Sequence, residues 1–459
     1  MRKIVKKLTS TVFIGTLLLC TVIGFYYTQL PDNYYLSNEA SGRFFGLETF
    51  FDVKVSPSEY HNQNNSRKND ALQVFKNAEN SNCDYEVQLK LFGLFPIKTA
   101  QAEEIERPEL VLGGTPFGIK ILTDGAIVTE LGMVEGEHGF SSPAREAGIK
   151  SGDVITKVNG IEISSNADVA NAVQQKSNGE ITQITFIRDD KERTVNITPK
   201  RSTQDGSYKI GMWVRDSSAG IGTLTFYNPN NSSFGGLGHA ICDIDTGQIM
   251  PISSGQTVPV YISGVVKGYT GAPGELCGTF VSRVSVGEIK GNTESGIFGI
   301  MPDPPVNAFD CCENIDEKSN ELQTIPMAYK QEVKVGPATI FTTIDGNTPK
   351  EYDIMIEKID YNPQNQTKNM VVKITDRNLL KETGGIVQGM SGSPIVQNGK
   401  LVGAVTHVFV GDPTRGYAIF AENMYRKSQQ FVPENNNDST ITIIDCNEYE
   451  GEYYFDEVA

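Results

Sequence analysis

The sequence predicts a mostly β chain that also contains a smaller α+β module and begins with an apolar segment. From about residue 207 to 433, β-branched and aromatic runs are separated by Gly, Asn and Asp turns, with little helical periodicity. Between about 106 and 200, short β-rich runs enclose the helical stretch NADVANAVQQKS. The chain has 459 residues, which is enough for about two or three domains of ordinary size.

The chain opens with a membrane-directed segment. Basic residues at positions 2, 3, 6 and 7 precede an apolar run from about 12 to 27 that contains no acidic residue. The run is near the lower limit for a spanning helix, and it ends in aromatic residues that suit a membrane interface better than a cleavage site. We therefore expect an uncleaved signal anchor over residues 1–29, with a cleavable signal peptide as the alternative. The basic residues would hold the N-terminus in the cytoplasm, which makes the rest of the chain extracytoplasmic.

Charge and cysteine content limit the possible partners. Asp and Glu total 56 against 40 Lys and Arg, and the 32 residues after Lys427 carry eight acids and no basic residue. Such a chain has no electrostatic reason to bind nucleic acid or an anionic lipid surface, so the anchor is the only membrane contact expected. The seven cysteines form no C-x-x-C pair, and the adjacent Cys311 and Cys312 do not resemble a zinc site. We expect no metal and no cofactor.

Residues 30–105 are predicted to form an extracytoplasmic linker. The segment is polar and rich in asparagine, with HNQNNSRKND at its centre, and such a composition favours an exposed chain that proteases can reach. A short hairpin is predicted near its end, in YEVQLKLFGLFPIK at 85–98.

Residues 106–200 resemble a PDZ domain, most specifically in SPAREAGIKSGDVITKVNG at 142–160. PDZ domains bind an extended peptide as an added strand at a sheet edge. The resemblance implies that Phe117, Gly118 and Ile119 open the peptide-binding strand and that backbone amides around Gly114 bind the peptide carboxylate. A bulky side chain at Gly118 should then block the peptide and spare the active site. The alternative is a module that only packs against its neighbour.

Residues 201–433 are predicted to form a closed or barrel-like antiparallel domain. Asn398 and Gly399 stand between SPIVQ and KLVGAVTHVFV, and this is the strongest short hairpin signal available. The cysteine-containing segment at 310–324 is predicted to be an insertion, and residues 434–459 an acidic tail.

Ser391 is the candidate nucleophile. It lies in GMSGSPIVQNGKLVGAVTHV, which resembles the trypsin-like pattern of Gly-x-Ser-Gly-x-Pro, a strand, Asn-Gly and a second strand. Glycines on both sides permit a tight turn that exposes the hydroxyl, and the amides of Gly389 and Ser391 can form an oxyanion hole. Ser393 is a poorer candidate, because Pro394 biases it toward extended backbone. The alternative is two buried strands whose glycine-rich approach only needs flexibility.

A serine nucleophile needs a base, and the chain has four histidines. His61 lies in the linker and His138 in a PDZ-like loop, so neither is well placed. His239 stands in FGGLGHAICDIDTG, 152 residues before Ser391, and this is the order seen in trypsin-like folds, where the base comes from the first barrel. His407 lies in the strand behind Ser391, and a structural role and a role as base are equally good explanations of a histidine there. We expect His239→Ala to abolish self-cleavage and His407→Ala to impair it mainly through folding.

Longer strings extend the resemblance from a fold to a family. YKIGMWVRDSSAGIGTLTFY, GGLGHAICDIDTG and VVKITDRNLLKETGGIVQGMSGSPIVQNGKLVGAVTHVFVGDPTRGYAI, together with the PDZ-like segment, resemble SpoIVB, a family of membrane-anchored serine peptidases of endospore-forming bacteria. The resemblance implies that His239 is the base, Ser391 the nucleophile and Asp376 the acid. Asp376 precedes Ser391 by only 15 residues, and Asp243 and Asp245, close behind His239, are alternatives for the acid.

The family resemblance also implies a biological role. The protein would cleave itself, leave the membrane, and act in the space around the forespore. Its substrate would be a membrane-protein ectodomain that inhibits an intramembrane metalloprotease, which processes a sporulation sigma factor. The PDZ module would select or present the chain to be cut, its own N-terminal segment included, or hold the enzyme back. Self-cleavage is expected between about residues 40 and 80. The alternatives are a catalytically silent PDZ adapter and a general extracytoplasmic quality-control protease.

Overall fold

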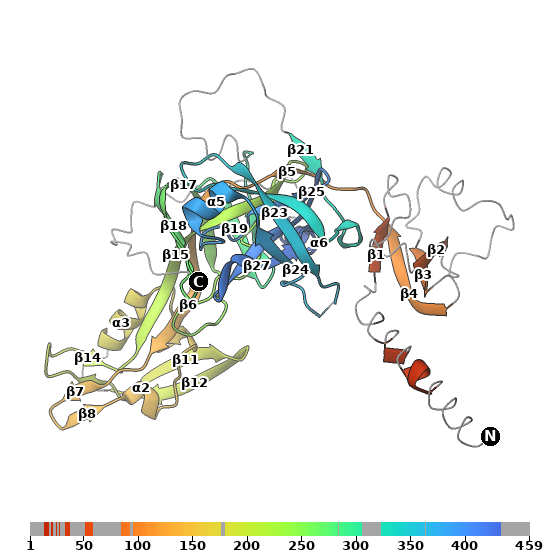
Figure 1. The fold of residues 1–459 in the computed structure, drawn as a ribbon. Coiled ribbons are helices and arrows are strands. Elements are labelled where there is room, and N and C mark those ends of the chain that lie inside the picture. The colour runs from red at the N-terminus through yellow and green to blue at the C-terminus, as the bar shows by residue number, and fades with distance from the viewer. Residues whose placement is uncertain are drawn as a thin grey trace.

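The computed structural model describes residues 13–17, 20–21, 24, 27, 33–36, 51–57, 84–91, 95–175, 180–282, 284–304, 323–362 and 364–432. Strands dominate these residues, which confirms the predicted mostly β class (Figure 1). Residues 310–322 of the predicted insertion, and the whole predicted tail, lie outside the described residues.

The predicted anchor lies largely outside the described residues. Of residues 1–29, only 13–17, 20–21, 24 and 27 are described, all as helix. Among the described residues, no helix is long and apolar enough to cross a membrane.

The hairpin predicted at 85–98 is confirmed by two antiparallel strands, β3 (Asp84–Leu91) and β4 (Phe95–Glu104). The sequence did not predict that these strands belong to a four-stranded sheet. Its other members are β1 (Asn33–Leu36), which runs parallel to β4, and β2 (Phe51–Pro57), which pairs with β3. The window predicted for self-cleavage, 40–80, therefore contains a paired strand at 51–57.

The PDZ-like module has a hydrophobic core of its own. In the SGDV motif, the buried Asp153 accepts two hydrogen bonds from Arg188, each 2.6 Å long, and one from the Lys150 amide, so the motif closes the turn before a strand. Two helices and several short strands surround this core (Figure 1). They are β7 (Val134–Gly136), β8 (Gly139–Ser141), α2 (Pro143–Glu146), β9 (Val154–Val158), β10 (Ile161–Glu162), α3 (Asn166–Gln175), β11 (Thr182–Arg188), β12 (Lys191–Ile197), β13 (Lys200–Arg201) and β14 (Tyr208–Lys209).

Two long strands leave this module and enter a ring of six strands. β6 (Pro116–Glu130) and β15 (Trp213–Asn228) pair along most of their length, and β15 also pairs with β16 while β6 pairs with β17. The order β6-β17-β19-β20-β16-β15 then returns to β6. The remaining members are β16 (Ser233–Gly236), β17 (Ser254–Val266), β19 (Gly287–Thr293) and β20 (Gly296–Ile300). β5 (Glu109–Leu112), β18 (Glu275–Phe280) and β21 (Thr324–Pro326) pair at its margins.

A second group of six strands forms a closed barrel, as the sequence predicts. The predicted hairpin is confirmed, because Asn398 and Gly399 both have positive φ angles, 53° and 73°, as a tight hairpin turn requires. The barrel consists of β22 (Gly336–Thr342), β23 (Lys350–Ile359), β24 (Met370–Ile374), β25 (Pro394–Gln397), β26 (Lys400–Phe409) and β27 (Asp412–Phe420). The helices α5 (Arg377–Thr383), α6 (Ala421–Ser428), η3 (Lys330–Glu332) and η4 (Gln429–Phe431) accompany it.

The predicted peptide-binding strand is wrong, because its residues belong to the first ring. Gly118 pairs with Ile221 of β15 on one side and with Val258 of β17 on the other, so no edge is free for a peptide. A Cβ at Gly118 would lie 2.6 Å from side-chain atoms of Phe280 and Val258. A tryptophan there would disrupt the ring rather than block a PDZ groove.

The neighbouring residues in that prediction are also engaged. Phe117 is fully buried and meets the ring of Phe234 edge to face, with 6.2 Å between centroids. Gly114 donates its amide to Leu224 O at 2.7 Å and accepts the Thr343 hydroxyl at 3.0 Å, which joins the ring to the barrel. The Phe-Gly-Ile pattern before a strand fits both locations, so the sequence alone could not separate them.

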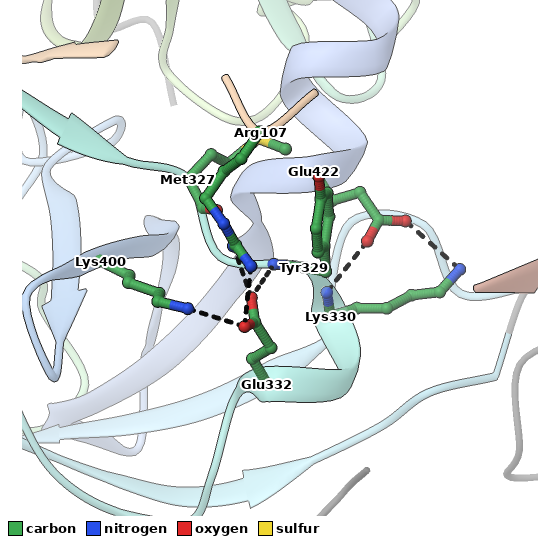
Figure 2. A network of polar contacts seen from close by, with 7 residues as sticks. All are labelled: Arg107, Met327, Tyr329, Lys330, Glu332, Lys400 and Glu422. Carbon is green, nitrogen blue, oxygen red and sulfur yellow. Dashed lines mark hydrogen bonds and ion pairs between the residues drawn. The ribbon is translucent and has the colours of Figure 1, made fainter. Parts of the chain in front are cut away.

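A buried ionic network fastens the segment before β5 to the second barrel (Figure 2). Arg107, whose side chain is 7% exposed, forms two hydrogen bonds to Glu332, of 2.7 and 3.0 Å. Lys400 at the start of β26 reaches the same carboxylate at 2.7 Å, and the Tyr329 amide donates to it at 2.9 Å. Burial would raise the pKa of Glu332, but these hydrogen bonds outweigh it and lower the pKa.

Candidate active site

His239 lies in a tight turn that follows β16. Leu237 and Gly238 both have positive φ, 63° and 74°, and they turn the chain out of the first ring. A Cβ at Gly238 would come within 2.8 Å of the Thr406 side chain, so glycine here allows the turn to approach strand β26 of the second barrel.

Ser391 lies in a second tight turn, immediately before β25. Gly389 and Gly392 flank it with φ of 91° and 94°, which is the conformation that the glycine-rich sequence suggests. A Cβ at Gly392 would stand 2.0 Å from Thr223 O and 2.5 Å from Leu237 N. The serine turn therefore packs directly against both β15 and the histidine turn.

Thr223 of β15 connects the two turns. Its amide donates to Ser391 O at 3.0 Å, its hydroxyl donates to Gly389 O at 2.7 Å, and its carbonyl accepts the Leu237 amide at 3.3 Å. Its side chain is 1% exposed. Sequence reasoning missed Thr223, because a threonine in the middle of a strand gives no sign of such distant partners.

The two turns open on one cavity of about 270 Å³. Its wall is mostly aliphatic, and no carboxylate stands among its lining residues. These are Ile119, Ser218, Ala219, Gly220, Ile221, Leu237, His239, Ile241, Pro273, Ile386, Val387, Gln388, Gly389, Ser391, Thr406, His407, Val408 and Val410. The structure thus brings together the predicted base from the first ring and the predicted nucleophile from the barrel.

The hydrogen bonds describe a resting arrangement. Ser391 donates its hydroxyl to Thr406 O at 2.7 Å, and the hydrogen bonds of the described residues include none between Ser391 and His239. His239 Nδ1 lies 2.8 Å from Ala240 O, so a proton on Nδ1 is held there and Nε2 keeps its lone pair. Burial lowers the pKa of His239 and the Ala240 contact partly opposes this, so the ring is neutral at neutral pH, as a base must be.

The predicted oxyanion hole has amides available. The protein hydrogen bonds of the described chain use neither the Gly389 amide nor the Ser391 amide as a donor, whereas the amides of Gln388, Met390 and Gly392 all donate. Two amides without a protein acceptor, beside a serine in a tight turn, can donate hydrogen bonds to the oxyanion that develops during the reaction. Their role stays a prediction.

The structure does not bring Asp376 to His239. The carboxylate of Asp376 caps helix α5 by accepting the amides of Asn378 and Leu379, both at 2.8 Å. It is absent from the cavity wall, and none of the hydrogen bonds found in the described ranges joins it to His239. The predicted role as orienting acid therefore has no contact to support it here.

The alternative acids are engaged elsewhere as well. Asp243, whose side chain is fully buried, forms an ion pair with Arg215 at 2.8 Å, and Asp245 pairs with the same guanidinium at 3.0 Å. Neither contributes to the cavity wall.

His407 lies in the cavity wall beside the predicted base. The ring centroids of His239 and His407 are 4.9 Å apart, with a tilt of 42°. A β-bulge between Val405 and His407 in strand β26 interrupts the regular alternation of side chains along the strand. The extra residue is Thr406, whose buried hydroxyl has no hydrogen-bond partner within the described part of the chain.

Comparison with known proteins gives two family matches. Residues 206–425 match the SpoIVB peptidase S55 model, and residues 120–198 match a PDZ domain model. The first match contains His239, Asp376 and Ser391. The second begins after Ile119, so it excludes the four residues predicted to bind the PDZ ligand.

Individual relatives cover smaller parts. The protein named "Probable periplasmic serine endoprotease DegP-like" of Brucella suis biovar 1 is 33% identical over 143 residues, which are 31% of this chain and 28% of the relative. "Serine protease Do-like HtrB" of Bacillus subtilis is 40% identical over 77 residues, 17% of each chain. The chain thus spans less than a third of the length of these curated relatives. Among solved structures, the active form of the Rv3671c protease from M. tuberculosis is 13% identical and covers 47% of this chain and 74% of its own. Its TM-score of 0.24 is too low to support a conclusion about the fold or the function.

Proposed function

The chain is a PDZ-containing member of the SpoIVB peptidase S55 family, and from that premise we propose that it is a serine endopeptidase with Ser391 as nucleophile and His239 as general base. The observation that carries the proposal is the placement of both side chains on one cavity, each in its own glycine-dependent turn from a different six-stranded unit.

The reaction follows from these positions. A rotation of the Ser391 side chain exchanges its acceptor, Thr406 O, for Nε2 of His239, which takes the hydroxyl proton as the oxygen attacks a peptide carbonyl. The electron pair of the carbonyl moves onto its oxygen, which the amides of Gly389 and Ser391 stabilise. His239 then gives the proton to the departing amine, and a water molecule repeats the sequence to release the acyl group. The aliphatic wall favours a substrate with an apolar side chain next to the cut bond.

The test uses the full chain as wild type, Ser391→Ala and His239→Ala. Each is incubated with fluorescently labelled unfolded casein, and its own intact mass is followed over the same period. We expect casein cleavage and self-processing in the wild type, and neither in the two variants, with melting temperatures close to that of the wild type. Equal cleavage by wild type and Ser391→Ala would refute the proposal.

The biological role is the finer part of the proposal. The resemblance of the N-terminal segment to a signal anchor supports a membrane-attached precursor that cleaves itself and acts outside the cytoplasm, and the printed name of the Brucella relative is in line with an extracytoplasmic protease. Family membership supports a sporulation role in the space around the forespore. There the substrate would be the ectodomain that inhibits an intramembrane metalloprotease of sigma-factor processing. A single cut in that ectodomain fits this role, while degradation of many unrelated unfolded proteins to small peptides would favour quality control.

The PDZ module is assigned a peptide-binding role at a different edge from the one the sequence suggested. Residues 213–215 of β15 pair with β6 on one side, and the strands of the described residues leave their other side unpaired. Helix α3 begins beside this edge, because the Asn166 amide donates to Asp216 at 2.7 Å. A peptide added here would lie along β15, the strand whose Thr223 holds the serine turn.

A further inference from the structure

We propose that His407 is a positioning residue of the peptidase: its neutral imidazole acts through His239, where it stabilises the imidazolium that forms when Ser391 loses its proton. This inference rests on the function proposed above. It adds the group that stabilises the charged form of His239, a role that a carboxylate has in other serine peptidases. It begins from the two imidazole rings, which lie 4.9 Å apart on the wall of the cavity that Ser391 enters.

The position of His407 depends on the bulge in β26. Val405 pairs with Ala418 and His407 pairs with Tyr417, so Thr406 is an extra residue that shifts the following side chain. The carbonyl of this extra residue receives the Ser391 hydroxyl at 2.7 Å. The bulge at Thr406 therefore holds the hydroxyl of Ser391 and also directs the His407 side chain toward His239. Bulges commonly redirect side chains next to active sites.

Among the described residues, the cavity wall holds no carboxylate, which is the partner that a histidine base usually has. A carboxylate normally holds the imidazole in one tautomer and stabilises its charge. Here Ala240 O fixes the tautomer through Nδ1, and the carboxylates of Asp376, Asp243 and Asp245 are occupied by a helix cap and an arginine. Ala240 O favours the charged form of His239 through this hydrogen bond, and His407, whose ring centroid lies 4.9 Å away, is a further polar group beside it.

His407 stays neutral when His239 becomes charged. Partial desolvation beside the cavity, together with the positive charges of His239 and Lys368, lowers the pKa of His407 to about 4, although part of the residue stays exposed to solvent. Across the strand pair it faces Tyr417, whose ring lies under the Lys368 ammonium at 5.2 Å. In the reaction the proton of Ser391 passes to His239, and the uncharged His407 offers the positive charge that results a polarisable ring at 4.9 Å between centroids.

The test measures how fast a fluorophosphonate labels Ser391 at pH values from 4 to 9. In this reaction the serine oxygen bonds to phosphorus, fluoride leaves, and the hydroxyl proton passes to His239, so the rate reports on the base without any peptide substrate. His407→Phe keeps an aromatic ring and removes both nitrogens. We expect it to slow labelling at high pH by about 10- to 100-fold and to move the acid limb to lower pH, because the imidazolium of His239 loses its partner.

His407→Asp gives the opposite shift. A carboxylate at this place favours the charged form of His239, so the acid limb should move to higher pH by about one unit or more. A purely structural role for His407 predicts no such reversal between the two variants. His407→Gln, neutral and capable of hydrogen bonding, should label faster than His407→Phe, and it replaces that variant if the latter does not fold. Phe409→Leu, on the same strand and outside the cavity wall, is the control and should label as the wild type does.

The outcomes separate this inference from the proposed function. If the wild type is not labelled at Ser391, the proposed function fails. Suppose that the wild type is labelled, that His407→Phe, or His407→Gln where His407→Phe does not fold, labels at a rate within about twofold of it, and that His407→Asp leaves the acid limb unchanged. The role of His407 is then refuted and the peptidase assignment stands.

Discussion

Thr223→Val tests whether β15 holds the catalytic turn in place. Valine keeps the shape of threonine and removes the hydroxyl that donates to Gly389 O at 2.7 Å, while the backbone hydrogen bonds from Thr223 to both turns remain possible. The carbonyl of Gly389 then loses the donor that fixes the Gly389–Met390 peptide plane. This plane lies between the Gly389 and Ser391 amides assigned to the oxyanion, so the loss should reach the chemistry.

The structure sets the size of the effect. Leaving a largely buried acceptor without its donor costs about 1–3 kcal/mol. In a unit of roughly 200 residues, each kcal/mol lowers the melting temperature by about 2–4 °C, so a fall of about 2–12 °C is expected. Removing an oxyanion donor outright costs about 100- to 1,000-fold in kcat, and a donor that is only misplaced should cost less, about 10- to 100-fold.

The assay compares the rate of labelled-casein cleavage with the melting temperature for three variants. Thr257→Val is the matched control, because the fully buried Thr257 also donates its hydroxyl to a strand carbonyl, that of Gly287 at 3.2 Å, and it does not line the cavity. Thr223→Ser keeps the hydroxyl and should restore most of the activity. If Thr223→Val and Thr257→Val lose stability and activity in the same proportion, the claim that Thr223 positions the turn is refuted.

Three further predictions concern the rest of the molecule. Glu332→Gln should cost about 2 kcal/mol, because Arg107 keeps its bond to Met327 O and loses the carboxylate. Because the pKa of Glu332 is lowered from its usual 4.5, the stability that its carboxylate contributes is fully present above pH 4.5 and is lost as pH falls through the folded-state pKa. Acidification should therefore lower the melting temperature of the wild type more steeply than that of Glu332→Gln. Parallel curves would contradict this. Trp213, the sequence's one tryptophan, is 68% exposed at the proposed peptide edge, so a bound peptide should change its fluorescence, and binding without any change would place the peptide elsewhere. N-terminal sequencing of the self-processed form should give a start between about residues 40 and 80; a start beyond Arg107 would remove the ionic network and contradict the prediction.

The sequence predicted those parts of the structure that depend on local rules. The Asn398-Gly399 turn needs positive φ at two successive residues, and the serine turn needs positive φ at Gly389 and Gly392. Asparagine and glycine are the residue types that adopt such angles most easily, so the sequence predicts both turns. The capping role of Asp376 was also open to prediction, because an aspartate directly before a helical stretch is a standard N-cap signal. The family resemblance implied the catalytic role instead.

The parts that could not be predicted depend on contacts between distant segments. Whether Gly118 opens a free edge or lies between two strands is decided by β15 and β17, which follow about 100 and 140 residues later. The placement of His407 depends on a single extra residue in β26, and period-2 alternation carries no sign of a bulge. Thr223 becomes a functional residue only when the ring and the barrel are brought together.

The site of a fluorophosphonate adduct tests the central assignment most directly. Purified full chain is labelled near pH 8, digested, and its peptides mapped by mass spectrometry. The account predicts a single adduct on Ser391 that is lost in Ser391→Ala and reduced at least about 100-fold in rate in His239→Ala. Either of two results would contradict it. One is an adduct on Ser393, which is fully buried and hydrogen-bonded to the Thr342 hydroxyl at 3.0 Å, and the other is a labelling rate on Ser391 that is unchanged in His239→Ala.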